Sequence, residues 1–336
     1  MAQFHILHAS DLHMALFPYK ASMPSLTIPA LSWLGKVAFW RQASHDPNVV
    51  AAFGELAERY YPITDVLLVT GDLATTGEPH DLQAAYTCYP AAPANNLVHV
   101  TAAGDPTLYR WASAGKLDLL PGNHDRFHPA YKGYRPGNGE FENVFCPSTG
   151  QQFWPKGQTV ARGFAVQRGP WELHVIKADF SLPASHHGKS FYWLPGWLGQ
   201  GTVDPTVLGL LKQETEDARA EIASRGSIPI TLWAIHFDPT STDEVLKLLD
   251  SEDLCQAAWE LCVPLILCGH THESKIKPLS DRTVAFVCGT SGQAGPGHKD
   301  CQIIGVDADD YGAKPPVFHV AWFRYGAGQF HFIGMR

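Results

Sequence analysis

The chain has 336 residues, of which 45% are hydrophobic and 17% are charged, a balance typical of a folded globular protein with a substantial core. Its formal net charge is −8, and no Lys or Arg stands next to another in the sequence, so it lacks the basic runs of duplex-binding proteins. The composition therefore disfavours both a disordered chain and a long nucleic acid as partner.

Five short apolar runs, each ending in a polar segment, predict the strands of a buried sheet. They are residues 4–8, 65–70, 117–120, 230–235 and 263–268. The run from Asp65 to Thr70 is nearly continuous and apolar on both faces, as in a strand covered on both sides.

Segments with helical periodicity lie between these runs, at residues 47–60, 80–88, 204–226 and about 243–262. In the third, Pro205 stands at the start and Gly226 just past the end, the usual asymmetry of helix termini. In the fourth, Ser241 and Glu244 have the spacing of a capping box. The alternation of strands and helices predicts a layered α/β fold.

Three long stretches interrupt this alternation, at about residues 14–46, 128–158 and 180–203. Loops of this length in a compact domain are usually functional, so we expect them to form a cap or pocket rim on a single domain of residues 1–336. After residue 272 the sequence predicts only short strands, at about 283–288, 302–306, 317–323 and 329–333.

A polar segment follows each of the five predicted strands. The segments are Asp11-Leu12-His13, Gly71-Asp72, Gly122-Asn123-His124-Asp125, His236 and Gly269-His270-Thr271-His272. In open α/β sheets, ligands bind beyond the carboxyl ends of the strands, so the segments can converge on one site. Their oxygen and imidazole donors are the ligands that two adjacent divalent metals require.

The spacing within these segments suggests how they project. Strand side chains alternate, which predicts that Asp11 and His13 point to the same side, and the same period puts His270 and His272 on one side of their loop. Asp72 follows a buried strand and a glycine, and we expect it to bridge two metals with one oxygen to each. Each fragment alone is common by chance, but five in order indicate a metal site.

Together the five segments, in this order, resemble the signature of the calcineurin-like metallophosphoesterase superfamily, over residues 4 to about 290. The resemblance implies an αββα sandwich, a mixed pair of central sheets flanked by helices. It implies two metal ions, which can be Mn, Fe, Zn or Co with this ligand set.

The resemblance also assigns roles to the residues. A first metal would be held by Asp11, His13, Asp72 and His272, and a second by Asp72, Asn123, His236 and His270. A metal-bridging hydroxide would attack phosphorus in line with the leaving oxygen. His124 would stabilise or protonate the leaving group, with Asp125 orienting or polarising it.

The segment from Gly71 to Gly77 is similar to the Gly-Asp-Leu-x-x-x-Gly pattern of the class III cyclic-nucleotide phosphodiesterase branch. Positions 75 and 76 are Thr, so the arginine with which protein serine/threonine phosphatases hold a monoester is missing. We therefore expect hydrolysis of a phosphodiester, small-molecule or cyclic-nucleotide-like. The alternatives are a phosphomonoesterase or nuclease of the same superfamily, and more remotely an inert binding scaffold.

The remaining features bear on the compartment. Seven cysteines without a C-x-x-C pair indicate reduced thiols, and the N-terminal residues lack the basic and apolar segments of a signal peptide. No segment approaches the roughly 18 apolar residues of a membrane span, so we expect a cytoplasmic enzyme. The sequence does not decide whether His186, His187 or His298 contacts a substrate.

Overall fold

A computed structural model of the chain describes residues 2–15, 45–88, 108–126, 140–146, 152–181, 200–244, 246–294, 297–309 and 314–336. Most of the three predicted insertions, together with His186 and His187, lies outside the described residues. Their role as a cap or pocket rim therefore stays a prediction. His298 is described and is exposed.

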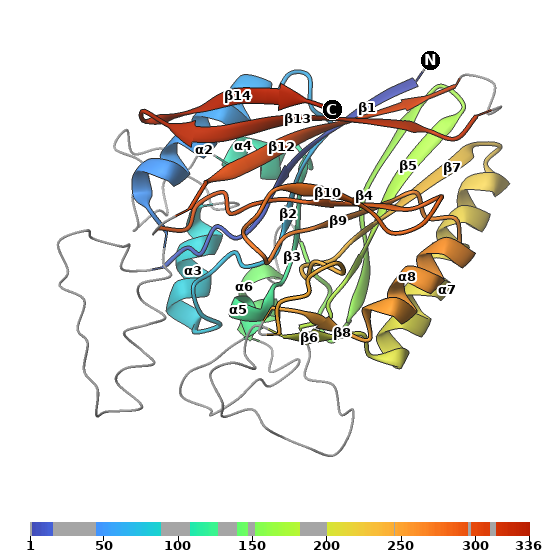
Figure 1. The fold of residues 1–336 in the computed structure, drawn as a ribbon, viewed down its shortest axis with the longest axis horizontal. Coiled ribbons are helices and arrows are strands. Elements are labelled where there is room, and N and C mark those ends of the chain that lie inside the picture. Colours follow the sequence, from blue (N-terminus) through green and yellow to red (C-terminus); the bar gives the residue numbers. More distant parts are fainter. Residues whose placement is uncertain are drawn as a thin grey trace.

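The first sheet has six strands in the order β14-β13-β12-β1-β2-β3 (Figure 1). Three neighbouring strands are parallel, and the C-terminal strands continue the sheet in antiparallel pairs. The parallel strands are β1 (Ala2–Ala9), β2 (Val66–Thr70) and β3 (Leu117–Leu120), and the C-terminal ones are β12 (Asp300–Ala308), β13 (Val317–Gly326) and β14 (Gln329–Met335).

The second sheet also has six strands, in the order β10-β11-β9-β7-β5-β4. Its four central strands are parallel and are β5 (Trp171–Ala178), β7 (Ile228–Ala234), β9 (Leu265–Cys268) and β11 (Val284–Val287). The antiparallel edges are β4 (Val160–Arg168) and β10 (Lys275–Pro278). The β4–β5 hairpin turns at Gly169 with a φ of 57°.

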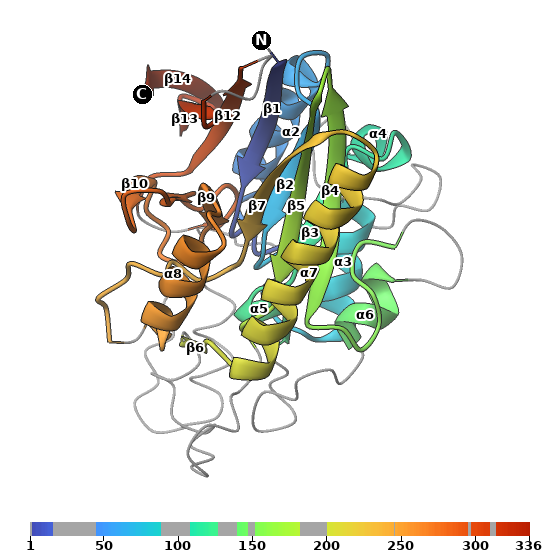
Figure 2. The ribbon, with the colours of Figure 1, turned by 90° about the vertical axis from the view of Figure 1, so that its right-hand side faces the viewer.

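Helices cover the outer faces of both sheets (Figures 1 and 2). On the first sheet lie α2 (Pro47–Tyr60) and α4 (Tyr109–Ser113), and beside them α3 (Pro79–Cys88) packs on α6 (Glu140–Phe145). On the second sheet lie α7 (Pro205–Ser224) and α8 (Ser251–Glu260). The layers confirm the predicted αββα sandwich. None of these described helices combines the length and apolar character needed to cross a membrane.

Two buried clusters hold the layers together. One unites α2 with both sheets through side chains such as Phe53, Ile6 and Leu232. The other lies between the second sheet and the helices α7 and α8. Helix α7 begins where predicted, because the Asp204 side chain accepts the N–H of Thr206 at 2.8 Å.

The predicted fourth helix begins too early, and its capping box is wrong. Residues Leu248–Leu249 form a short strand, β8, which pairs with β6 (Gly201–Thr202) in a parallel ladder. Asp250 then has a φ of 58°, so the helix cannot start before Ser251. Residues 128–158, predicted as a loop, contain the helix α6.

A buried ion pair joins the two sheets. The Lys177 ammonium on β5 lies 2.6 Å from an Asp118 carboxylate oxygen on β3, and donates to the carbonyls of Leu119 and Phe153 at 2.9 Å. Both charged side chains are buried, and each supplies the opposite charge that the other needs there.

We expect Lys177→Met to lower the free energy of unfolding by about 3–5 kcal/mol, because it leaves the Asp118 carboxylate buried without its cation. The matched control, Lys212→Met, breaks an exposed pair with Glu260 at 3.1 Å and should cost less than about 1 kcal/mol. Urea denaturation of both variants tests this. Equal losses would contradict the account.

His8 on β1 makes the first sheet sensitive to acid. Its ring lies 2.9 Å from the Thr70 hydroxyl and 2.7 Å from the Gln302 amide, which donates to Nδ1. Burial lowers the pKa of His8 to about 3. At pH values between this pKa and about 6.5 the unfolded chain binds more protons, so stability falls as the pH falls.

Between pH 7 and pH 4 we expect the wild-type protein to lose about 3 kcal/mol more stability than a His8→Gln variant. The comparison is made by denaturation with a chelator present, so that metal binding does not change with pH. Parallel stability curves for the two proteins would refute the assignment.

Candidate metal centre

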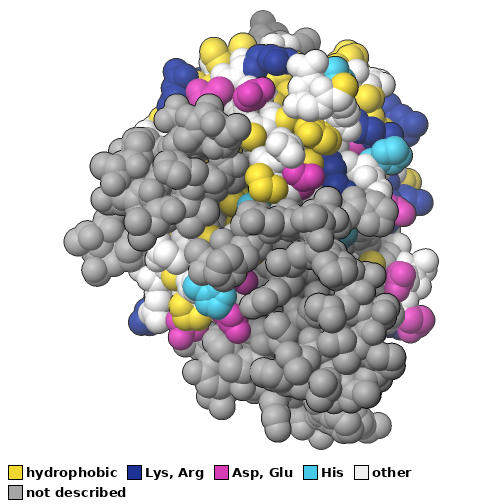
Figure 3. Space-filling view, turned by 90° about the vertical axis from the view of Figure 1, so that its left-hand side faces the viewer, with side chains coloured by type: hydrophobic (Ala, Val, Ile, Leu, Met, Phe, Trp, Pro, Cys, Tyr) yellow, Lys and Arg dark blue, Asp and Glu magenta, His cyan; other side chains and the backbone are white. Residues whose placement is uncertain are grey.

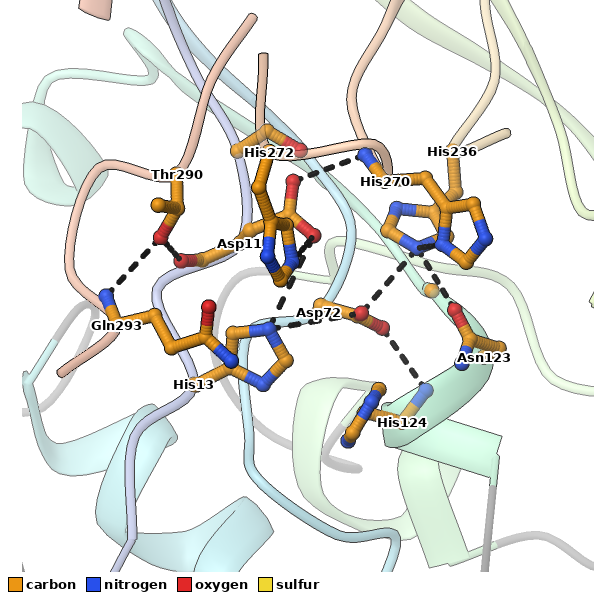
Figure 4. Close-up of polar contacts among 12 residues, drawn as sticks. Asp11, His13, Asp72, Asn123, His124, His236, His270, His272, Thr290 and Gln293 are labelled. Atoms are coloured by element: carbon orange, nitrogen blue, oxygen red, sulfur yellow. Dashed lines mark hydrogen bonds and ion pairs between the residues drawn. The ribbon is translucent and has the colours of Figure 1, made fainter. Parts of the chain in front are cut away.

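The five predicted polar segments meet at one edge of the two sheets (Figure 4). Each follows the carboxyl end of a strand: the first segment follows β1, the second β2, the third β3, the fourth β7 and the fifth β9. The third segment forms a short helix, α5 (Asn123–Arg126). The side chains of eight residues lie together there: Asp11, His13, Asp72, Asn123, His124, His236, His270 and His272.

Three groups of these side chains have ligand atoms within 4.8 Å of one another. One group is Asp11, His13 and His272, and another is Asp72, His236 and His270. The third joins His13 and Asp72 to His124, so the groups are contiguous. The donor atoms therefore form one continuous cluster of overlapping ligand groups.

In the first group, buried donor atoms lack hydrogen bonds. Among the described residues, neither ring nitrogen of His13 has a hydrogen-bond partner, and the Oδ1 atom of Asp11 has only ion-pair contacts with histidine nitrogens. Nε2 of His13 is 3.9 Å from that oxygen, too far for a bond, whereas Nε2 of His272 is 3.2 Å from it. Since buried polar atoms are almost always partnered, these atoms fit a metal ligand set.

In the second group, one nitrogen faces three acceptors. Nδ1 of His236 lies 2.8 Å from the Thr70 carbonyl and donates to it. Nε2 then lies 2.9 Å from the Asn123 carbonyl oxygen, 3.2 Å from Asp72 Oδ2 and 3.1 Å from His270 Nδ1. A proton satisfies one of these acceptors at a time, whereas the four residues together could serve as ligands of one metal ion.

The pKa values of the histidines in the second group are strongly shifted by burial and by neighbouring charges. Burial acts to lower the pKa of His236, but the Asp72 and Asp11 carboxylates outweigh it and raise the pKa to about 9. Burial lowers the pKa of His270 to about 3, with the charge of His236 acting in the same direction. The two carboxylates thus favour positive charge in this part of the cluster.

One carboxylate oxygen of Asp72 lies near histidines of both the first and the second ligand group. Its Oδ2 atom is 3.2 Å from His236 Nε2 and 3.8 Å from His13 Nε2, while Oδ1 accepts the backbone N–H of His124 at 2.8 Å. Oδ1 thus supports the start of the short α5 helix, and the bridging of two metals by Asp72 stays a prediction.

Five candidate ligands have left-handed backbones. Their φ angles are 55° at Asp11, 49° at His13, 50° at Asp72, 71° at His270 and 57° at His272. The expected reason for their alignment was therefore wrong, since none follows strand alternation, and His270 and His272 join different groups. Such backbones cost about 1–3 kcal/mol each and concentrate at functional sites.

Backbone bonds hold these strained residues. The hydrogen-bond ladder between β1 and β2 continues past the ends of both strands. The backbone N–H groups of Asp11 and His13 donate to the backbone carbonyls of Gly71 and Asp72, at 3.1 and 2.9 Å. The Asp11 carboxylate also accepts the N–H of His270 at 3.0 Å. The first and fifth segments are thereby fixed to each other.

Glycines in the segments allow the close approach. A Cβ at Gly71 would lie 2.6 Å from His236 Nδ1, one at Gly122 would overlap Asp72, and one at Gly269 would overlap Ser10. A side chain at any of the three would push a donor atom or a supporting residue out of place.

His124 and Asp125 have different partners from those expected. Nδ1 of His124 is 2.8 Å from the Thr75 carbonyl and donates to it. The Asp125 oxygens accept the N–H groups of Gly122, Leu73 and Ala74 at 2.8, 3.0 and 2.7 Å, and so join the second and third segments. Burial and the Asp72 charge raise the pKa of Asp125 to about 7.

Sequence reasoning missed several supporting residues. The Thr290 hydroxyl donates to the Asp11 carbonyl at 2.7 Å, and no local pattern reveals this contact across 279 residues. Asp238 is buried and lies 2.6 Å from the Lys275 ammonium, so this ion pair joins the loop after β7 to the start of β10. In the sequence, Asp238 stands only two residues after His236, in His236-Phe237-Asp238-Pro239.

The fold is similar to solved structures at low identity. GAP50, the anchor in the inner membrane complex of Plasmodium, aligns with a TM-score of 0.54 and 10% identity over 100% of this chain and 90% of its own. A dimetal phosphatase from Danio rerio aligns with a TM-score of 0.52 and 9% identity over 99% of each chain. These likenesses show the fold alone.

Comparisons of the sequence point to a family. Curated proteins gave no match. The model of the calcineurin-like phosphoesterases matches residues 4–274, a span that includes all five polar segments. Members of this family use a dinuclear metal centre, and the groups around Asp11 and Asp72 are candidate ligand clusters for one. The chain therefore belongs to the calcineurin-like phosphoesterase family.

Proposed function

We propose that this protein hydrolyses a phosphodiester at a dinuclear metal centre. Asp11, His13, Asp72 and His272 hold the first metal in this proposal, and Asp72, Asn123, His236 and His270 hold the second. The observation that carries it is the His236 Nε2 atom, which faces an oxygen of Asn123, an oxygen of Asp72 and a nitrogen of His270 within 3.2 Å. When bound, the metal ions polarise the phosphoryl oxygens and activate water.

In this proposal His124 acts on the leaving group. Its Nδ1–H is held by the Thr75 carbonyl, so in this proposal Nε2 is the ring atom that donates a proton to the departing oxygen. Thr75 also donates its hydroxyl to the His13 carbonyl at 2.6 Å, so one residue orients both histidines. Asp125 supports His124 through the backbone, by fixing the Gly122 turn.

The positions of Thr75 and Thr76 support a diester rather than a monoester. Both are buried, and their hydroxyls are bonded inside the protein, to the His13 carbonyl and to Asp81 at 2.7 Å. Neither position supplies a cation for the second charge of a monoester dianion. A diester, with one charge, needs no such group, so we propose a small-molecule or cyclic-nucleotide-like diester.

The surface supports a small substrate over a long nucleic acid. On the face in Figure 3, the Lys and Arg side chains of the described residues are scattered among acidic and apolar ones. The described part of this face therefore shows no continuous basic strip of the kind that tracks a phosphate backbone. The net charge of −8 acts in the same direction.

Hydrolysis of two chromogenic esters by manganese-loaded protein tests the proposal. We expect bis-p-nitrophenyl phosphate to be hydrolysed with a kcat/KM at least about tenfold above that of p-nitrophenyl phosphate. The reverse order would make the protein a phosphomonoesterase. A metal-loaded protein that hydrolyses neither ester would overturn the enzymatic assignment in favour of a binding scaffold.

A further inference from the structure

The turn after β11 is fixed to the first metal-binding segment. The N–H of Gln293 donates to the Thr290 hydroxyl at 3.1 Å, and that hydroxyl donates to the Asp11 carbonyl. Gly292 packs so closely on Leu12 that a Cβ there would lie 2.8 Å from the Leu12 carbonyl oxygen. The backbone of Gln293 is therefore placed by the residues between Asp11 and His13.

A third segment completes this arrangement. The backbone N–H of His45 donates to the His13 carbonyl at 2.9 Å, and that of Asp46 donates to the Gly292 carbonyl at 2.9 Å. His45 and Gln293 form an isolated antiparallel bridge. Three segments far apart in the sequence thus hold Gln293 in a fixed relation to His13.

The side chain of Gln293 is available at the site. It points toward His13 in Figure 4, beside the group formed by Asp11, His13 and His272. Gln293 is half-buried, whereas its neighbours Gly292 and Ala294 are buried. Among the described residues its carboxamide has no hydrogen-bond partner, so within this part of the chain its N–H groups remain for a ligand.

We propose that Gln293 is a substrate-binding residue whose carboxamide N–H donates to a phosphoryl oxygen on the Asp11 side of the centre. This inference rests on the proposed function and refines it. A carboxamide contributes a hydrogen bond without adding a positive charge. It therefore suits a diester monoanion, whereas a lysine or arginine there would favour a dianion.

Binding of inorganic phosphate to manganese-loaded protein tests this role apart from catalysis. We expect Gln293→Ala to raise the phosphate dissociation constant roughly tenfold or more, as for a hydrogen bond to a charged group. Gln293→Glu should raise it further, because a carboxylate repels phosphate. Both variants should keep two metal ions per chain and the wild-type Tm. The matched control, Gln256→Ala, changes an exposed glutamine on α8 and should change nothing.

Three results would overturn the role of Gln293. The first is an unchanged phosphate dissociation constant in both variants, and the second is a loss of metal in both, which would make the residue structural. The third is a Gln293→Glu variant that binds phosphate as well as the wild type does. Failure of the proposed function looks different, since a wild-type protein that binds metal and phosphate but hydrolyses neither ester still shows the effect of Gln293.

Discussion

Asp72→Ala should abolish turnover and remove metal from the protein. Oδ2 of Asp72 lies within 4 Å of Nε2 in both His13 and His236, so both metal groups lose a donor at once. Changes to residues behind a metal ligand cost about 10- to 100-fold in metal affinity or activity, and loss of a shared ligand should cost more. Metal content and kcat/KM of the purified variant measure the effect.

Asp217→Ala is the matched control for this variant, because Asp217 is an exposed carboxylate on α7 that bonds Gln213. It should keep the wild-type metal content and rate. Near-normal turnover in Asp72→Ala would show that Asp72 does not join the two groups.

Gly122→Ala should impair the site without removing any ligand. The new Cβ would overlap the Asp72 carboxylate and its backbone N–H, so either Asp72 or the α5 helix must move. Overpacking of this kind costs about 1–3 kcal/mol. The displaced Asp72 oxygen should also weaken metal binding and lower activity. Thermal denaturation and metal titration of the variant measure both effects.

The control for Gly122→Ala is Gly209→Ala, at an exposed position of α7 where a Cβ meets nothing within 4 Å. Alanine is favoured over glycine inside a helix, so this variant should gain about 0.5–1 kcal/mol of stability. If both variants change stability and metal affinity alike, the close packing at Gly122 has no role in the site.

The sequence predicted the location of the site because local patterns mark the strand ends. Each polar segment follows an apolar run, and parallel strands bring their carboxyl ends to one edge. Helix ends could also be predicted where residues typical of helix termini are present, as at Pro205 and Gly226 of α7. The fold class followed from the same alternation of strands and helices.

The features that could not be predicted from the sequence depend on contacts between residues far apart in the chain. The left-handed backbones of Asp11 and His13 come from bonds to the loop after β2, and strand alternation predicted the right neighbours for the wrong reason. The Ser241 capping box was misleading, because pairing of β8 with β6 overrode the local helical preference. The partners of Asp125 likewise depend on where the Gly122 turn meets the Ala74 backbone.

The most direct test is the position of bound metal in a crystal grown with manganese. We expect two anomalous peaks per chain, about 3.5–4 Å apart, with the Asp72 carboxylate between them. One peak should lie among Asp11, His13 and His272, and the other among Asn123, His236 and His270. A single peak, or peaks away from these side chains, would contradict the dinuclear centre.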